Sequence, residues 1–269
     1  MRIACPSISR CPAAAPTSSF APTPSALLPT DRFTGLAGLY GQARPSYPPE
    51  LVRWCSDRVP PHGVIVDLGC GTGISTRLFA ATGHQVIGID PNADMLAAAR
   101  AEGPEDYRLG TSEHTGLPDA CADLVIAAQA FHWFDVPRTL TEIERISKTH
   151  ATCVAFWNVR SEDTPFMQGY EQLLRTWSTE YEVNERAGKT ISAIRAVVPH
   201  AEEREFLNPV PMDSERVRSL ALSSSYVKHG VRDIPAFLKA LDALLDATLE
   251  RGLVEMRYAV RAIAWKVNG

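Results

Sequence analysis

The sequence predicts an α/β fold built on a doubly wound, mostly parallel β-sheet. Short apolar segments at residues 64–68, 85–89, 123–128 and 152–157 alternate with segments of helical character. Such alternation is typical of a parallel sheet whose strands are joined by crossover helices. A glycine-rich turn directly after the first of these strands, and an acidic residue after the second, indicate a ligand site at the carboxyl ends of the strands.

Each element is predicted from the composition of its own segment. The first strand, V-I-V-D-L, is short, largely β-branched and bounded by prolines and glycines, as expected of a buried parallel strand. Helices are predicted at residues 74–81, 92–101 and 136–147, and a short strand at residues 107–109. In the C-terminal third, amphipathic or alternating patterns predict helices at 166–181 and 236–249 and strands at 204–212 and 254–267.

Length and composition are those of one large globular domain. The chain has 269 residues, 45% of them hydrophobic and 22% charged, with a net charge of −4 and a pI near 6.0. The acidic balance argues against a nucleic-acid partner, and no apolar run reaches the roughly 18 residues of a membrane span. The six cysteines are scattered and the histidines have no ligand-like spacing. We therefore expect a reduced, cytoplasmic protein without disulfides or a metal site.

The first 30 residues differ from the rest of the chain. They are rich in Pro, Ala and Ser, and residues 1–29 contain no acidic side chain. Such a composition does not support a packed core. A disordered tail, an organelle transit peptide and an over-extended gene start near residue 27 or 28 are three possible interpretations, of which we favour the third. We expect the folded domain to span residues 31–269.

The glycine turn at residues 67–73, D-L-G-C-G-T-G, discriminates between nucleotide ligands. A dinucleotide site requires G-x-G-x-x-G/A, in which the last small residue allows the helix to pack closely on the strand. Counted from Gly69 the sixth residue is Ile74, and counted from Gly71 it is Thr76, so neither register fits. A turn with no ligand is the simpler alternative.

The acids beside the turn favour a different cofactor. Asp67 would repel a pyrophosphate but suits the ammonium group of a methionine moiety, and Asp90 suits the two ribose hydroxyls. The run V-D-L-G-C-G-T-G resembles motif I of class I S-adenosylmethionine (SAM)-dependent methyltransferases. The resemblance implies that SAM is the cofactor, and that Gly69, Gly71 and Gly73 let the backbone approach it.

Three further segments resemble one subgroup of these enzymes. They are Y-G-Q-A-R-P-S-Y-P at residues 40–48, Q-A-F-H-W-F at 129–134 and W-N-V-R at 157–160. They resemble small-molecule methyltransferases of the methyltransferase domain 11 type, including trans-aconitate methyltransferase-like proteins, over roughly residues 31–267. The resemblance implies a seven-stranded Rossmann-like sheet with a final antiparallel strand and a helical C-terminal cap. The Pro-Gly-Gly turn of such relatives is replaced here by K-T-H-A at residues 148–151, where we expect an effect on local stability.

The resemblance also suggests which residues surround the cofactor. Ser112 matches the place where relatives contact the adenine, and Gln129 follows the fourth strand at the ligand edge of the sheet. Tyr40 and Arg44 lie on a segment that either folds over the cofactor as a lid or, at Arg44 and Pro45, forms a structural turn. We assign Ser112 and Gln129 to the cofactor, and Tyr40 and Arg44 to the substrate.

Five residues are candidates for the acceptor side. His132 suits a general base toward a hydroxyl acceptor, with local shaping of the pocket as the alternative. Trp133 and Trp157 are assigned to the pocket wall, with a core position as the alternative. Asn158 follows the fifth strand. Arg160 is assigned to bidentate binding of a carboxylate, with a solvated surface position as the alternative.

These observations together predict methyl transfer from SAM to a small organic acceptor, with a carboxylate as one candidate. A SAM-binding protein without methyl transfer is one alternative, and a methyltransferase acting on a protein or RNA is another. We expect a small-molecule substrate, no nucleic-acid or membrane partner, and a monomer or homodimer.

Overall fold

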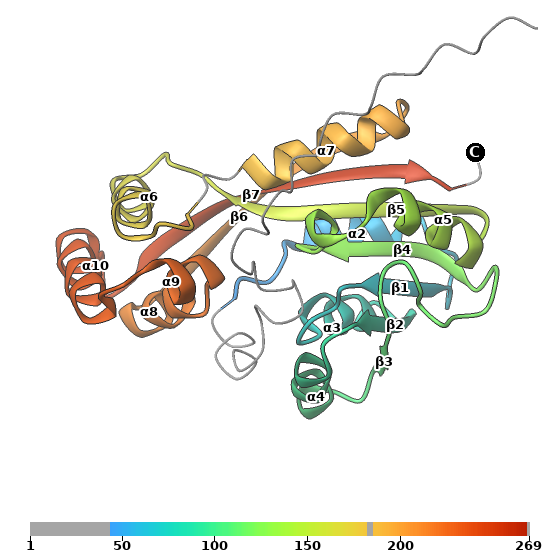
Figure 1. The fold of residues 1–269 in the computed structure, drawn as a ribbon, viewed down its shortest axis with the longest axis horizontal. Coiled ribbons are helices and arrows are strands. Elements are labelled where there is room, and N and C mark those ends of the chain that lie inside the picture. Colours follow the sequence, from blue (N-terminus) through green and yellow to red (C-terminus); the bar gives the residue numbers. More distant parts are fainter. Residues whose placement is uncertain (1–43, 182–184, 268–269) are drawn as a thin grey trace, which may run out of the picture.

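The computed structural model describes residues 44–181 and 185–267, and a seven-stranded sheet runs through its centre (Figure 1). The strand order is β3-β2-β1-β4-β5-β7-β6. Strands β1 to β5 are parallel, whereas β7 runs antiparallel between β5 and β6. The predicted fold class is therefore confirmed, including the antiparallel strand near the end of the chain. The strands are β1 Val64–Leu68, β2 Gln85–Asp90, β3 Asp106–Leu109, β4 Ala122–Ala128, β5 Ser147–Arg160, β6 Glu202–Met212 and β7 Val254–Lys266.

Helices cover both faces of the sheet. Ile65 of β1 packs in a cluster with residues of α2 and α3, and its neighbour Val66 packs in a cluster with residues of α5 and α7. Because successive side chains of a strand point to opposite faces, the two clusters form the two cores of a doubly wound domain. The helices are α2 Pro49–Ser56, α3 Ile74–Ala80, α4 Ala93–Glu102, the 3₁₀ turn η2 Phe131–Trp133, α5 Val136–Ile146, α6 Pro165–Trp177, α7 Glu185–Val197, α8 Ser214–Leu222, α9 Ser225–Gly230 and α10 Ile234–Thr248.

A helical cap lies beyond one end of the sheet, at the left in Figure 1. Helices α6, α8, α9 and α10 enclose a third core that includes Tyr170, Phe237 and Leu241, all fully buried or nearly so. Met212 of β6 and Met256 of β7 join the same core, because these two long strands continue past the parallel part of the sheet. The cap is therefore connected to the sheet by β6 and β7 and lies over the carboxyl ends of the parallel strands.

Several observed bounds differ from the predicted ones. Strand β5 runs from residue 147 to 160 rather than from 152 to 157, because Ser147 pairs with Ala122 of β4 and β7 pairs with β5 up to Arg160. Helix α6 ends at Trp177, and α10 begins at Ile234, where the Asp233 side chain accepts a hydrogen bond from the Ala236 backbone and caps the helix. Helices α2, α7, α8 and α9 lie outside the predicted elements.

The segment K-T-H-A at residues 148–151 lies in the first part of β5, at the opposite end of the strand from Arg160. His150 has a φ of 68°, a left-handed conformation that non-glycine residues rarely adopt. Among the described residues, none of the helices is long and apolar enough to span a membrane, and no three metal-ligating side chains form a group.

Candidate functional site

The glycine turn after β1 has three residues with positive φ: 70° at Gly69, 54° at Gly71 and 78° at Gly73. A Cβ atom on Gly69 would lie 2.6 Å from the Cβ of Ala130, and one on Gly73 would lie 2.2 Å from the hydroxyl of Tyr107. A Cβ on Gly71 would meet no described atom within 4 Å, because this residue faces a cavity. The outer glycines are therefore needed for packing, and the middle one leaves backbone open to a ligand.

Asp90 ends β2 directly opposite this turn. One carboxylate oxygen accepts a hydrogen bond from the Gly71 backbone at 2.8 Å, and the other accepts one from the Asn92 backbone at 2.9 Å. Burial raises the pKa of Asp90, although these two backbone hydrogen bonds counteract it. The carboxylate lines the cavity in a fixed orientation and has lone pairs left for two adjacent hydroxyls.

Asp67 is placed differently from the sequence expectation. It is fully buried, and one carboxylate oxygen accepts hydrogen bonds from the hydroxyls of Ser75 at 2.6 Å and Thr76 at 2.7 Å. Burial raises the pKa of Asp67 to about 6, against the effect of these hydroxyls. Asp67 does not line the cavity, because its side chain turns toward the start of α3, and Ser75 lies at the cavity wall instead. Direct contact between Asp67 and a methionine ammonium stays a prediction.

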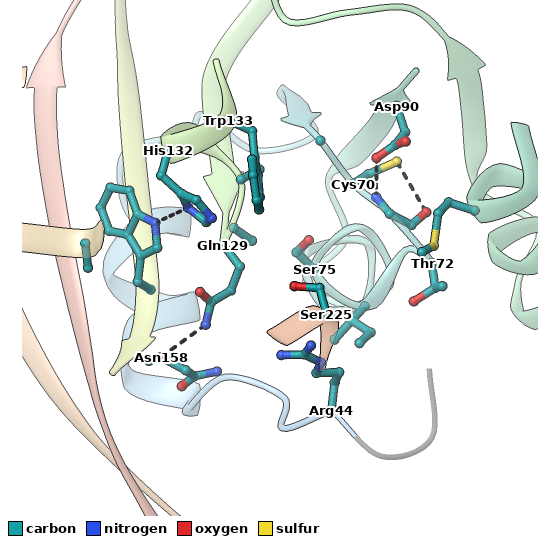
Figure 2. Close-up of a pocket in the computed structure, with 18 of the residues that line it drawn as sticks. Arg44, Cys70, Thr72, Ser75, Asp90, Gln129, His132, Trp133, Asn158 and Ser225 are labelled. Carbon is teal, nitrogen blue, oxygen red and sulfur yellow. Dashed lines mark hydrogen bonds between the residues drawn. The ribbon is translucent and has the colours of Figure 1, made fainter. Parts of the chain in front are cut away.

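The cavity has a volume of about 570 Å³ and extends from the glycine turn to the cap. Figure 2 shows Gln129, His132 and Trp133 on one side of it and Cys70, Thr72 and Asp90 across from them. Gly73, like Asp67, is not part of the wall, and Tyr40 lies outside the described residues. Those predicted site residues that do line it are Arg44, Gly69, Gly71, Asp90, Ser112, Gln129, His132, Trp133, Trp157, Asn158 and Arg160.

Ser112 lies on the loop after β3, next to the end of β2. Its hydroxyl donates a hydrogen bond to Glu113 at 2.9 Å and accepts one from Thr139 of α5 at 3.1 Å. Met95 of α4 lines the same part of the cavity and is almost fully buried. An apolar side chain beside fixed polar groups suits an adenine ring, and contact between Ser112 and the adenine stays a prediction.

The same loop is fastened to α5 by Glu142. This carboxylate accepts hydrogen bonds from the Thr115 backbone at 2.8 Å and the Thr115 hydroxyl at 2.6 Å, and it pairs with Arg145 at 2.7 Å. The hydrogen bonds from Arg145 and Thr115 outweigh burial and lower the pKa of Glu142 to about 2. Glu142 therefore holds the loop as a carboxylate over the whole physiological pH range.

Gln129 directly follows β4 with a φ of 56°, a strained conformation that recurs at binding sites. Its side-chain amide donates to the Asn158 carbonyl at 3.3 Å. The Asn208 amide donates to the Asn158 side chain at 2.9 Å and to the Ser46 carbonyl at 2.8 Å. These contacts fasten the segment that carries Arg44 to the ends of β5 and β6, so that this segment forms one wall of the cavity.

His132 and Trp157 are joined by a hydrogen bond. The indole Nε1–H of Trp157, a buried residue of β5, donates to Nδ1 of His132 at 3.2 Å. An indole nitrogen is only a donor, so Nδ1 must be the acceptor and the hydrogen of a neutral imidazole must be on Nε2. In this tautomer His132 offers an N–H group rather than a basic lone pair. The geometry therefore argues against the general-base role predicted for His132.

Arg160 ends β5 inside the cap rather than at the surface. Its guanidinium forms an ion pair with Glu171 of α6, which is fully buried, and donates to the hydroxyls of Tyr181 at 2.8 Å and Tyr226 at 3.1 Å. Because Glu171 already compensates its charge, Arg160 is not poised for bidentate binding of a substrate carboxylate. That predicted role, and the surface alternative, both disagree with the observed pairing.

Sequence reasoning missed the cap residues of this cluster. Tyr181, Tyr226 and Tyr258 line the cavity although they are distant from motif I in the chain. No local motif marks them, since the segment after α6, helix α9 and strand β7 bring them together only in the folded protein. The adjacent Tyr170 and Glu171 within a predicted amphipathic helix were the available signal, because a buried glutamate requires a cationic partner.

Comparisons with known proteins agree with this geometry. A methyltransferase domain family matches residues 66–155, the part of the chain that carries the glycine turn and Asp90. An uncharacterized methyltransferase of Schizosaccharomyces pombe is 34% identical over 139 residues, covering 50% of this chain and 55% of the relative. One from Mycobacterium bovis is 37% identical over 131 residues, covering 48% and 53%. The chain thus spans about half the length of the curated relatives it matches.

Solved structures extend the similarity beyond the matched region. A type II methyltransferase of Anaeromyxobacter dehalogenans superposes with a TM-score of 0.62 at 25% identity, covering 83% of this chain and 98% of that one. A methyltransferase from an antibiotic biosynthesis pathway of Anabaena variabilis shares the fold, with a TM-score of 0.61 at 19% identity over 82% of this chain and 99% of that one. Residues 66–155 thus match a methyltransferase domain family, and the described sheet has the fold of these solved methyltransferases.

Proposed function

We propose that this protein transfers a methyl group from SAM to a small organic acceptor. One observation carries the proposal: a single cavity joins the donor side, formed by the glycine turn and Asp90, to an acceptor side formed by the cap. The residues fit the donor, because Gly71 leaves an open cradle and Asp90 presents a fixed, buried carboxylate. When bound there, SAM supplies a methyl group already activated on a sulfonium.

The contribution of the chain is alignment and exclusion of water. Asp90 orients the ribose, the loop with Ser112 holds the base, and the aromatic wall of Trp133 and Trp157 shields the reacting end. Fixing two reactants in a near-attack geometry accelerates transfer without covalent chemistry by the protein. The aromatic faces also suit a sulfonium cation.

The size and lining of the cavity favour a small acceptor. A volume of about 570 Å³ lies within the range of ordinary small-molecule sites. The cap closes over the acceptor side, which leaves less room for a protein or RNA substrate. The net charge of −4 argues in the same direction.

The pairing of Arg160 with Glu171 favours a neutral acceptor over a carboxylate. A malonyl-[acyl-carrier protein] O-methyltransferase of Pectobacterium atrosepticum is 35% identical over 123 residues, but the match covers 42% of this chain and 49% of that enzyme. A carboxylate acceptor would need a cation other than Arg160.

Calorimetry with SAM and with its demethylated product tests the donor site. Asp90→Asn should weaken SAM binding by about 10- to 100-fold, the usual effect of removing hydrogen bonds to a charged group. Asp94→Asn is the matched control, since Asp94 lies four residues on, exposed and outside the cavity wall. Equal affinities for the two variants would contradict the assignment of Asp90 to the ribose.

Turnover separates an enzyme from a binding module. The wild type should convert SAM to S-adenosylhomocysteine with at least one member of a panel of phenols, small acids and amines. Tight SAM binding without turnover on every acceptor would favour the alternative of a SAM-binding protein that does not transfer methyl groups.

A further inference from the structure

We propose that the Tyr226 phenolate accepts the proton of a hydroxyl acceptor, and that Arg160 stabilises this phenolate by its hydrogen bond to the Tyr226 oxygen. This inference rests on the proposed function and specifies the acceptor class, a phenol or enol that must lose a proton when it is methylated.

The geometry of the cap positions Tyr226 for this role. Tyr226, in α9, lines the cavity and is partly exposed to it. Arg160 Nη1 donates to its hydroxyl oxygen at 3.1 Å. The other guanidinium nitrogens bind Glu171 and Tyr181, so the edge that faces Tyr226 is held in place. A hydrogen bond from a cation stabilises a phenolate more than a phenol, and therefore favours the ionised form of Tyr226.

The charged and titratable groups around Tyr226 come from every packed element. Burial alone raises the pKa of this phenol, but Arg160, Arg44 and the Ser224 hydroxyl outweigh burial and bring the pKa below its ordinary value. The groups that face this cluster are Arg44 before α2, Arg160 of β5, Tyr170 and Glu171 of α6, Tyr181 after α6, Arg216 of α8 and Tyr258 of β7.

Tyr181 contacts the same guanidinium but is not suited to the same role. Its hydroxyl donates to the Glu171 carboxylate and accepts from Arg160 at 2.8 Å. Loss of its proton would place a phenolate beside a carboxylate, and burial together with Glu171 raises the pKa of Tyr181. Two tyrosines on one arginine thus differ in their readiness to ionise, and only Tyr226 is prepared to take a proton.

The proposed step balances without another reactant. The Tyr226 phenolate takes the acceptor proton, the acceptor oxygen forms a bond to the methyl carbon, and the electrons of the breaking carbon–sulfur bond stay on sulfur. Tyr226 then returns its proton to solvent. His132, held as an N–H donor by Trp157, does not compete for the proton.

Tyrosine ionisation of the full-length protein tests the proposal without an acceptor. The ultraviolet absorbance of tyrosinate, followed against pH, should show one residue ionising below the ordinary value of about 10. That step should be absent in Tyr226→Phe and present in Tyr181→Phe, a matched control that removes a hydroxyl from the same guanidinium. Identical titration curves for the wild type and Tyr226→Phe would overturn the proposal.

Turnover with phenols of graded acidity tests the catalytic role. With phenol, Tyr226→Phe should lower kcat by about 10²- to 10⁴-fold with little change in KM, and should abolish the rise of the rate with pH. With 4-nitrophenol, which ionises readily in solution, the loss should be much smaller. Equal losses on both acceptors would contradict a proton-accepting role. A wild type that binds SAM but methylates neither phenol would contradict this inference, whereas a wild type that does not bind SAM would contradict the proposed function itself.

Discussion

The indole of Trp157 donates a hydrogen bond to Nδ1 of His132 across 3.2 Å, and this contact determines what the histidine can do. Both residues belong to the acceptor wall of the cavity. Because the indole has no lone pair to offer, the imidazole accepts on one side and presents an N–H on the other. The residue that most resembles a general base in the sequence is thus a hydrogen-bond donor in the fold.

This relationship predicts a single imidazole tautomer. In ¹⁵N NMR spectra of the wild type at neutral pH, His132 should be in the Nε2–H form. Trp157→Phe removes the donor and should produce a mixture of tautomers. Trp133→Phe, at the neighbouring ring 4.8 Å from the His132 ring centre, should leave the tautomer unchanged. An Nδ1–H form in the wild type would contradict the observed geometry.

Glu142 should stabilise the protein through its bonds to the adenine-side loop. Glu142→Gln should lower the unfolding free energy at pH 7 by about 1–3 kcal/mol, because the charged hydrogen bonds to Thr115 and Arg145 are weakened. Glu144→Gln is the control, because Glu144 is exposed on the same helix, and it should change the unfolding free energy little.

The effect of Glu142 should also depend on pH. Its pKa falls from 4.5 to about 2 on folding, so its stabilisation is complete above pH 4.5 and is lost as pH falls toward 2. Denaturant unfolding at several pH values measures this. If the difference in unfolding free energy between the wild type and Glu142→Gln stays constant between pH 4.5 and about 2, the stabilising role of the Glu142 carboxylate is contradicted.

Asp67 should give the folding stability a pH dependence opposite to that of Glu142. Its pKa rises from 3.8 to about 6 on folding, so the folded state holds the proton more tightly and loses stability as pH rises between these values. A shift of this size corresponds to roughly 3 kcal/mol. In Asp67→Asn, the unfolding free energy from urea denaturation should no longer fall between pH 3.8 and about 6. A variant whose unfolding free energy falls with pH as steeply as that of the wild type would contradict the prediction.

His150 should lower stability because of its backbone conformation. Its φ of 68° is costly for any residue with a Cβ, and its exposed side chain makes no described hydrogen bond that would offset the cost. His150→Gly should therefore raise the melting temperature, by the equivalent of about 0.5–1 kcal/mol, with SAM affinity unchanged.

His200→Gly is the matched control for this change. His200 is also an exposed histidine but lacks a positive φ, so glycine there should give no stabilisation. Equal shifts in the melting temperatures of the two variants would show that the conformation of His150 is not the cause.

Local sequence patterns are enough to predict the arrangement of the donor half of this protein. The order of strand, glycine turn, helix and acid is local, and short-range rules of strand burial and turn geometry place Gly71 and Asp90 at one edge of the sheet. Those same rules predicted the parallel strands and the amphipathic helix α10. They do not determine where Asp67 points, because its partners Ser75 and Thr76 come from the packing of the next helix.

The acceptor half depends on contacts between segments that are distant in the chain. Arg160 and Glu171 lie eleven residues apart, but Tyr226 is 66 residues from Arg160 and reaches it only through the packing of α9 against the cap. Whether an arginine is free to bind a carboxylate, or a histidine to accept a proton, depends on which partner occupies it. Long-range burial brings such partners together, and the pattern around Glu171 signals that a cation is needed without showing which one.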